Sequence, residues 1–166
     1  MLYDFGVTAT DSEFPIYVQP LVIGNNIYGT ASGGGTNDGG GTVWELVYSS
    51  GSKTYSQQVL YNFYANPNDG CGPYWQVVEG KNADTLYGTT SFCGEALGGT
   101  LFELTYAKPK KGATGNGWTE TSYSFGVSDS NYDPYDQLVK DQSGNLYGMT
   151  SLGGSYVLGN VFEYQP

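Results

Sequence analysis

Two aspartates form the pair of side chains in this sequence that comes nearest to a catalytic arrangement. The sequence contains no histidine and no arginine, so it lacks the usual general base for a serine or cysteine nucleophile and the side chain that binds phosphate in a bidentate manner. A glycosidase would need two carboxylates roughly 5 to 9.5 Å apart across a sugar. Asp133 and Asp136 suit this role best, and a carbohydrate-active enzyme is the least favoured of the functions considered.

Repeated carboxylates form a second candidate site. Glu45, Glu103 and Glu163 each follow an aromatic residue at the same point of a repeated pattern. They could line a channel and hold a cation, or each could accept hydrogen bonds from backbone amides or a neighbouring hydroxyl. A residue that recurs in every unit is more easily explained by the shared fold than by a single site. We therefore expect the structural role.

Acidic loops could also bind calcium, which takes six to eight oxygen ligands. Asp69, Asp129, Asp133 and Asp136 lie in suitable segments, but their spacing matches no EF-hand loop or other calcium signature. We expect solvated turn aspartates at these positions, with no metal ion and no cofactor.

Aromatic side chains beside asparagines and carboxylates form the favoured candidate site. Aromatic faces stack on the C–H faces of sugars, while amides and carboxylates pair with sugar hydroxyls. We expect these residues on one rim of the fold, because they lie before the first strand or between the second and third strands of a repeated unit. The candidate ligand-binding residues are Tyr17, Asn37, Asp38, Tyr74, Trp75, Glu95, Tyr132, Tyr135 and Tyr156.

The elements that must position these side chains belong to a pattern that occurs three times, with a period of about 60 residues. Each unit has a proline-led segment, an aliphatic residue followed by Tyr-Gly, a glycine-rich loop, and an aromatic-Glu pair. An aromatic-x-Phe segment ends the first two units and also occurs at residues 3–5. The tyrosines of the Tyr-Gly pairs are Tyr28, Tyr87 and Tyr147, and the aromatic residues before glutamate are Trp44, Phe102 and Phe162.

Turn residues between these segments predict antiparallel hairpins. Gly24-Asn25-Asn26 and Gly144-Asn145 are examples, since glycine and asparagine readily adopt the positive φ that a tight hairpin needs. The 26 glycines and 16 tyrosines, set among short runs rich in Val and Thr, are typical of an all-β protein. We predict one all-β domain, residues 1–166, of three four-stranded units at approximately 14–63, 72–125 and 133–166.

The two ends of the chain suggest how the units are arranged. Residues 2–5 resemble the last strand of a unit, whereas the third unit stops after its third strand. Three β-propeller blades are fewer than the usual four to eight. We therefore predict a homodimer in which residues 2–5 of one chain complete the third blade of the other, giving a six-bladed ring. A β-trefoil or β-prism monomer is the alternative fold.

Three segments resemble a known family. LYGTTSFCGEALGGTLFEL at 86–104, DQSGNLYGMT at 141–150 and GWTETSYSF at 117–125 are similar to the tandem repeat called GloVer. That repeat is found in large bacterial surface proteins and is often predicted to form β-propeller blades. The resemblance covers nearly the whole chain. It implies an extracellular or cell-surface location and carries no reaction, catalytic residue or cofactor.

The two cysteines lie on the predicted rim of the second unit. Cys71 precedes its proline-led segment and Cys93 lies in its glycine loop. A disulfide between them would close a loop of about twenty residues and contribute roughly 3 kcal/mol in the chain-entropy estimate. It would also favour an oxidising compartment. The alternative is two unconnected buried thiols.

The charge balance excludes several partners. A formal net charge of −10 would repel nucleic acid and anionic membrane surfaces, and the longest apolar runs are too short to insert into a membrane. We expect a non-enzymatic extracellular binding or adhesion module, with carbohydrate as its ligand. A purely structural repeat unit of a surface assembly or fibre is the alternative function.

Overall fold

The computed structural model describes residues 1–126 and 131–166, and these residues form antiparallel β-sheets without any helix. The first sheet has the strand order β2 (Leu21–Ile23), β3 (Asn26–Ala31), β5 (Thr42–Ser49) and β6 (Thr54–Asn62). The second has the order β8 (Val78–Glu79), β9 (Thr85–Thr90), β11 (Thr100–Tyr106) and β12 (Trp118–Ser124). In the third, β15 (Leu146–Gly153) pairs with β13 (Asn131–Pro134), β14 (Val139–Lys140) and β16 (Asn160–Tyr164). The all-β prediction is confirmed.

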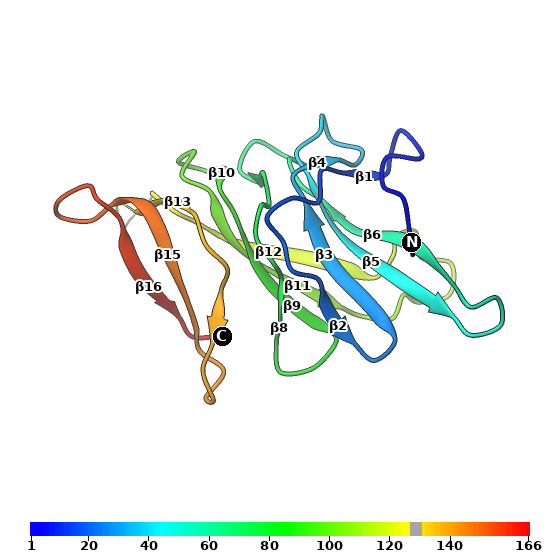
Figure 1. Ribbon diagram of the computed structural model, residues 1–166. Coiled ribbons are helices and arrows are strands. Elements are labelled where there is room, and N and C mark those ends of the chain that lie inside the picture. Colours follow the sequence, from blue (N-terminus) through cyan, green and yellow to red (C-terminus); the bar gives the residue numbers. More distant parts are fainter. Residues whose placement is uncertain (127–130) are drawn as a thin grey trace.

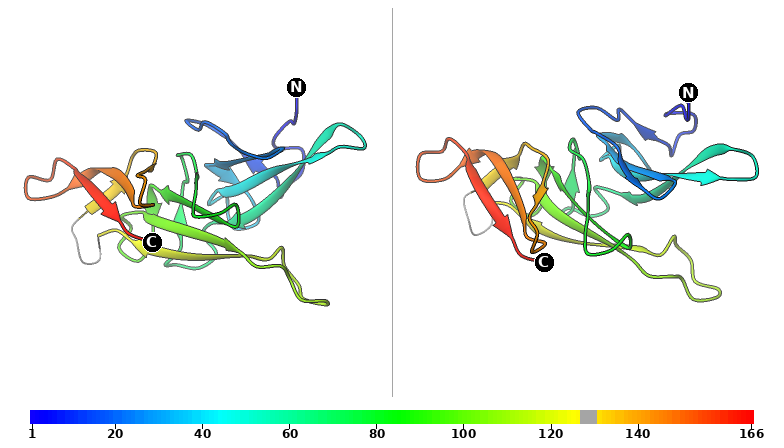
Figure 2. Two further views of the ribbon diagram at one scale, coloured as in Figure 1. Left: turned by 90° about the horizontal axis from the view of Figure 1, so that it is seen from below. Right: turned by 60° about the horizontal axis from the view of Figure 1, so that its bottom comes forward.

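The three sheets follow one another across the molecule in chain order (Figures 1 and 2). Two short strand pairs form separate two-stranded sheets: β1 (Ser12–Glu13) with β4 (Gly33–Gly34), and β7 (Gly70–Cys71) with β10 (Phe92–Cys93). In Figure 1 the strands β4, β10 and β13 lie along one edge of the molecule. The described part of the chain has no helix that is long and apolar enough to span a membrane.

One cross-strand arrangement explains the repeated sequence pattern. In each sheet the glycine of the Tyr-Gly pair lies opposite the aromatic residue that precedes glutamate, and a Cβ atom on that glycine would come within 2.4 Å of the facing ring. Glycine is needed there because the ring occupies the space of a side chain. The three pairs are Gly29 with Trp44, Gly88 with Phe102, and Gly148 with Phe162.

The core consists of apolar clusters between neighbouring sheets. Val43 of the first sheet and Phe102 of the second belong to one buried cluster. Leu101 of the second sheet and Leu146 of the third belong to the next. The second sheet therefore contributes buried side chains to both of its faces, as a sheet between two neighbours must.

Residues 2–5 form no strand within their own chain, and their pairing with the third unit of a second chain stays a prediction. Tyr3 and Phe5 pack instead on Trp44, at the outer face of the first sheet. The strand β16 lacks an outer neighbour among the described residues. It lies at the far end of the molecule from the N-terminus (Figure 1), so residues 2–5 cannot pair with it within one chain. The third sheet has four strands, and none of the described residues forms a further strand beside β16.

Candidate functional site

The three proline-led segments meet at one rim and form a cleft of about 420 Å³, which we call the aromatic cleft. Phe92 lies in β10 and Tyr135 directly follows β13, so the cleft belongs to the edge that carries these strands in Figure 1. The lining residues are Ile16, Tyr17, Tyr74, Trp75, Phe92 and Tyr135.

Trp75 has two aromatic neighbours in this cleft. Its ring centroid lies 6.0 Å from that of Tyr17 and 5.4 Å from that of Tyr135. The Tyr74 ring lies 6.5 Å from Tyr17 and 6.0 Å from Phe92. Tyr17 is 73% exposed and Tyr135 57% exposed. Large parts of these two rings are therefore open to solvent and available to a ligand.

Contacts between neighbouring units hold the lining segments in place. The Thr30 hydroxyl of the first unit donates a hydrogen bond to the Trp75 carbonyl at 3.0 Å. Pro73 packs against Gly41, where a Cβ atom would lie only 2.5 Å from the proline Cδ. The proline contact recurs one unit later, between Pro134 and Gly99. A hydrogen bond at a different position, from the Ser91 hydroxyl to the Pro134 carbonyl, also joins the second unit to the third. The aromatic cleft is therefore built across all three units.

Four of the nine predicted ligand-binding residues line this cleft: Tyr17, Tyr74, Trp75 and Tyr135. Two further lining residues, Ile16 and Phe92, are not among these nine candidates. Ile16 follows Pro15 in a proline-led segment, which is a signal that could have found it. Phe92 directly precedes Cys93 in the sequence. Its position in the cleft depends on the disulfide that Cys93 forms.

Cys71 and Cys93 form a disulfide, as predicted, with their Cα atoms 5.3 Å apart. The bond links β7 to β10, and Phe92 lies opposite Cys71 in this strand pair. The disulfide therefore ties the strand that carries Phe92 to the strand that precedes Tyr74 and Trp75.

A smaller hollow of about 290 Å³ adjoins the aromatic cleft and shares Tyr74 and Phe92 with it. Asp38, Tyr64 and the disulfide cysteines also line this hollow. The predicted residue Asp38 thus lies beside the aromatic cleft and supplies a carboxylate to the same rim.

A family model described as the Gloeobacter/Verrucomicrobia repeat matches residues 2–166. The chain belongs to this repeat family. No curated protein and no solved structure matches the chain significantly. Membership of a repeat family accounts for the recurrence of one hairpin in all three sheets, and it confirms the resemblance to a bacterial repeat.

The repeated glutamates of this Gloeobacter/Verrucomicrobia repeat protein pair with the repeated tyrosines. Glu45 Oε1 accepts a hydrogen bond from the Tyr28 hydroxyl at 2.6 Å, and the same bond in the third sheet measures 2.9 Å. In the second sheet, burial and then the neighbouring Glu103 raise the pKa of Tyr87 to about 12. These contacts support the structural role of the glutamates, since each tyrosine lies opposite its glutamate in the hairpin.

Asp69 is buried and holds a loop of the repeat. Its carboxylate accepts hydrogen bonds from the Tyr61 hydroxyl at 3.1 Å and from the backbone N–H groups of Ala65 and Gly70, both at 2.8 Å. Burial raises the pKa of Asp69, and the hydrogen bonds act in the opposite direction. Asp11 accepts the three corresponding bonds in the preceding unit. Both carboxylates therefore serve as loop anchors.

Asp133 and Asp136, which were also considered for calcium or catalysis, do not line the aromatic cleft. Burial raises the pKa of Asp133, and Asp136 accepts a hydrogen bond from the backbone N–H of Gln137 at 2.7 Å. Asp129 lies outside the described residues. Across the described part of the chain, no three acidic or cysteine side chains come close enough together to hold a metal ion.

The remaining predicted ligand-binding residues also lie outside the aromatic cleft. The Asn37 side chain donates a hydrogen bond to the Asn62 carbonyl at 3.0 Å, and Tyr132 packs against the glycine loops of the second unit. Glu95 is exposed. Tyr156 is 86% exposed in the loop between β15 and β16.

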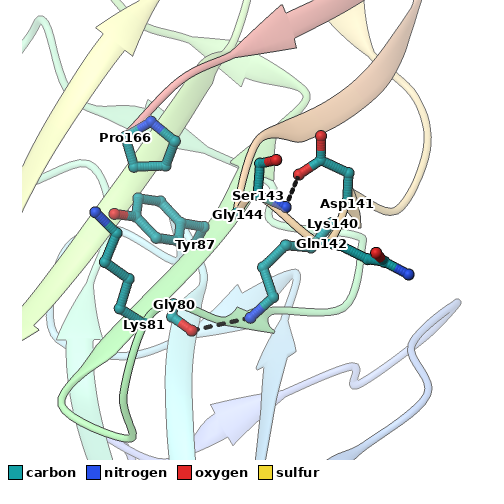
Figure 3. A pocket seen from close by; sticks show the side chains of 9 residues that line it. All are labelled: Gly80, Lys81, Tyr87, Lys140, Asp141, Gln142, Ser143, Gly144 and Pro166. Atoms are coloured by element: carbon teal, nitrogen blue, oxygen red, sulfur yellow. Dashed lines mark hydrogen bonds between the residues drawn. The ribbon is translucent and has the colours of Figure 1, made fainter.

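A third hollow, of about 260 Å³, lies at the opposite ends of the strands, between the β8–β9 and β14–β15 turns (Figure 3). Lys140 Nζ donates hydrogen bonds to the carbonyls of Glu79 and Gly80, the latter at 2.9 Å. Asp141 accepts a hydrogen bond from the backbone N–H of Ser143 at 2.8 Å. These charged groups hold the two turns, and we assign no ligand to this hollow.

Proposed function

We propose that this protein is a non-enzymatic extracellular binding module whose aromatic cleft takes a carbohydrate. The observation that carries the proposal is the convergence of Tyr17, Tyr74, Trp75 and Tyr135, from three separate segments, on one cleft. Open ring faces can stack on the C–H faces of a sugar. The Asp38 carboxylate in the adjoining hollow can accept hydrogen bonds from sugar hydroxyls.

Binding is favoured over hydrolysis by the chemistry of the lining residues. The six residues of the aromatic cleft include no carboxylate, whereas glycoside hydrolysis normally uses two. Asp133 and Asp136 stay the candidates for a carbohydrate-active enzyme. Hydrolysis of a glycan that persists after Asp133→Asn and Asp136→Asn would remove both of them.

Replacing Trp75 with alanine should weaken glycan binding at least about tenfold, which corresponds to about 1.4 kcal/mol of binding free energy. The expected loss follows from the position of Trp75, whose ring has Tyr17 and Tyr135 as neighbours. A glycan array identifies the ligand, and isothermal titration calorimetry of the tightest binder measures the loss.

Tyr156→Ala is the matched control for this experiment. Tyr156 is an aromatic residue that is 86% exposed and does not line the cleft, so its removal should leave the affinity unchanged. Equal affinity of wild type and Trp75→Ala would contradict the proposal. Lack of binding across a broad glycan panel would contradict it as well.

We further propose that the sheets are β-propeller blades and that two chains form a six-bladed ring. The strand orders β2-β3-β5-β6 and β8-β9-β11-β12, in which consecutive strands of a unit are neighbours, support this arrangement. The apolar clusters between successive sheets support it too. A β-trefoil or β-prism would instead close within one chain. The disulfide is consistent with an extracellular location.

A purely structural repeat unit of a surface assembly or fibre is the second candidate function. It is supported by the outer edge of β16, which has no strand partner among the described residues. End-to-end association without binding of any small ligand would favour this function over carbohydrate binding.

A further inference from the structure

We propose that the exposed face of the third sheet is a docking surface for the first sheet of a second copy of this chain. This open face consists of Val139, Tyr147, Met149, Val161 and Glu163. The side chains of β15 and β16 that alternate with these residues point toward the second sheet. The proposal rests on the blade arrangement proposed above and is independent of carbohydrate binding.

The open face repeats positions that are buried in the first two sheets. The equivalent cross-strand pairs are Thr30 with Val43, Thr89 with Leu101, and Met149 with Val161. Members of the first two pairs are at most 3% exposed, whereas Met149 is 48% and Val161 is 73% exposed. The face that is buried in the first and second sheets is therefore exposed to solvent in the third. Large exposed apolar patches commonly mark interaction sites.

The next sheet covers these positions inside the chain. Val43 lies in one buried cluster with Leu86 and Phe102 of the second sheet. Leu101 lies in the next cluster with Leu146 of the third sheet. The covering residues occupy the same two kinds of position each time, the aliphatic residue before Tyr-Gly and the aromatic residue before glutamate.

The first sheet offers this covering surface at the other end of the molecule. Ile27 and Trp44 occupy the two covering positions there, and they cluster with Leu46, Tyr3 and Phe5 on the outer face of the sheet. A second copy of the chain therefore carries the counterpart of the surfaces that cover Val43 and Leu101. Because the outer face of the first sheet has the residues that cover the equivalent positions within the chain, we take a second copy as the partner that covers the open face.

The N-terminal segment already has the geometry of the end of an outer strand. The Phe5 ring lies 5.0 Å from the Trp44 ring at an angle of 58°. At the junctions between sheets, the corresponding rings also lie 5.0 Å apart, at angles of 59° and 57°. Those junction pairs are Phe63 with Phe102, and Phe125 with Phe162. Phe63 and Phe125 follow outer strands, while Phe5 follows a segment without a strand partner in its own chain.

The free edge of β16 can provide that strand partner. Beside this edge lies a hollow of about 320 Å³, lined in part by Leu101, Phe162 and Tyr164. In the first two sheets, the tyrosine of the outer strand lies opposite the same position of the third strand: Tyr61 opposite Val43, and Tyr123 opposite Leu101. By this register, Tyr3 of the second copy lies opposite Val161. Strand addition would also protect an exposed sheet edge.

Light scattering after size exclusion, at several concentrations, tests the proposal with the whole chain. The wild type should have a molar mass near twice 17.8 kDa, because two reciprocal dockings close the assembly. Val161→Glu should be monomeric, since it places a charge in the apolar contact. Val161 is 73% exposed, so the variant should keep the wild-type circular dichroism spectrum.

Val157→Glu is the matched control, because Val157 is 65% exposed but lies in the loop outside the open face. It should remain dimeric. A photoreactive amino acid at position 161 should crosslink to a peptide that contains Tyr3 of the other copy. A wild type that is monomeric at every concentration, or a folded Val161→Glu variant that stays dimeric, would overturn the proposal. Glycan binding by the monomeric variant would leave the proposed function standing, because one chain supplies the whole aromatic cleft.

Discussion

Replacing Phe102 with alanine is expected to lower the free energy of unfolding by about 3 to 5 kcal/mol, the usual range for a buried phenylalanine. Phe102 is fully buried between the first and second sheets. Its ring covers Gly88 and lies 5.0 Å from the ring of Phe63. Truncation would leave a cavity between two packed sheets. The hydrogen-bonded backbones of these sheets cannot move freely to fill it. Urea unfolding of the wild type and the variant measures the loss.

A double-mutant cycle connects this loss to the repeated Tyr-Gly motif. Gly88→Ala should itself cost about 1 to 3 kcal/mol, as overpacking does, because the new Cβ atom would lie 2.4 Å from the Phe102 ring. In the double variant the alanine side chain can occupy part of the space that the ring has left, so the combined loss should be smaller than the sum. Tyr156→Ala, at an 86% exposed site, should change stability by less than about 0.5 kcal/mol. Strictly additive losses would contradict the explanation of the motif.

Removal of the disulfide, by Cys71→Ser together with Cys93→Ser, is expected to cost roughly 3 kcal/mol of unfolding free energy in the chain-entropy estimate. The bond closes a loop whose ends are 22 residues apart, and its loss increases the entropy of the unfolded chain. Chemical denaturation of the oxidised wild type and of the double variant gives the difference.

Reduction of the wild type supplies the control for the disulfide experiment. A reductant should bring the stability of the wild type close to that of the double-serine variant and should leave the variant itself unaffected. A double variant as stable as the oxidised wild type would contradict the prediction. Because β7 and β10 carry the cysteines and Phe92, the double variant should also bind glycan more weakly.

The hairpins could be read from the sequence because their determinants are local. Turn residues such as Gly24 and Gly144 take the positive φ that they were expected to take. In each hairpin, the aromatic residue before glutamate needs a glycine opposite its ring, as Phe102 needs Gly88. This requirement fixes the register of the two strands. The disulfide was also predictable, since both cysteines lie in one unit and on one rim.

Contacts between distant parts of the chain have no comparable local signal. Residues 2–5 have the sequence of an outer strand, but the edge of β16 lies at the far end of the same chain (Figure 1), so their predicted strand partner has to come from a second chain. On the rim, Tyr132 and Tyr135 are alike in sequence context, but Tyr132 packs on glycine loops while Tyr135 lines the aromatic cleft. Asp133, which lies between them, has a φ of 54°. A positive φ at a residue other than glycine has no clear sequence signal.

The most direct test of the proposed site is fluorine NMR of protein labelled with 5-fluorotryptophan. The chain has three tryptophans, and they lie in different surroundings. Trp44 is 4% exposed next to Phe5, and Trp118 packs against Tyr106 at 5.4 Å, so neither belongs to the aromatic cleft. Titration with the tightest glycan from the array should shift the Trp75 resonance and leave the other two in place. A saturable shift of Trp44 or Trp118 without any change at Trp75 would contradict the assignment of the binding site.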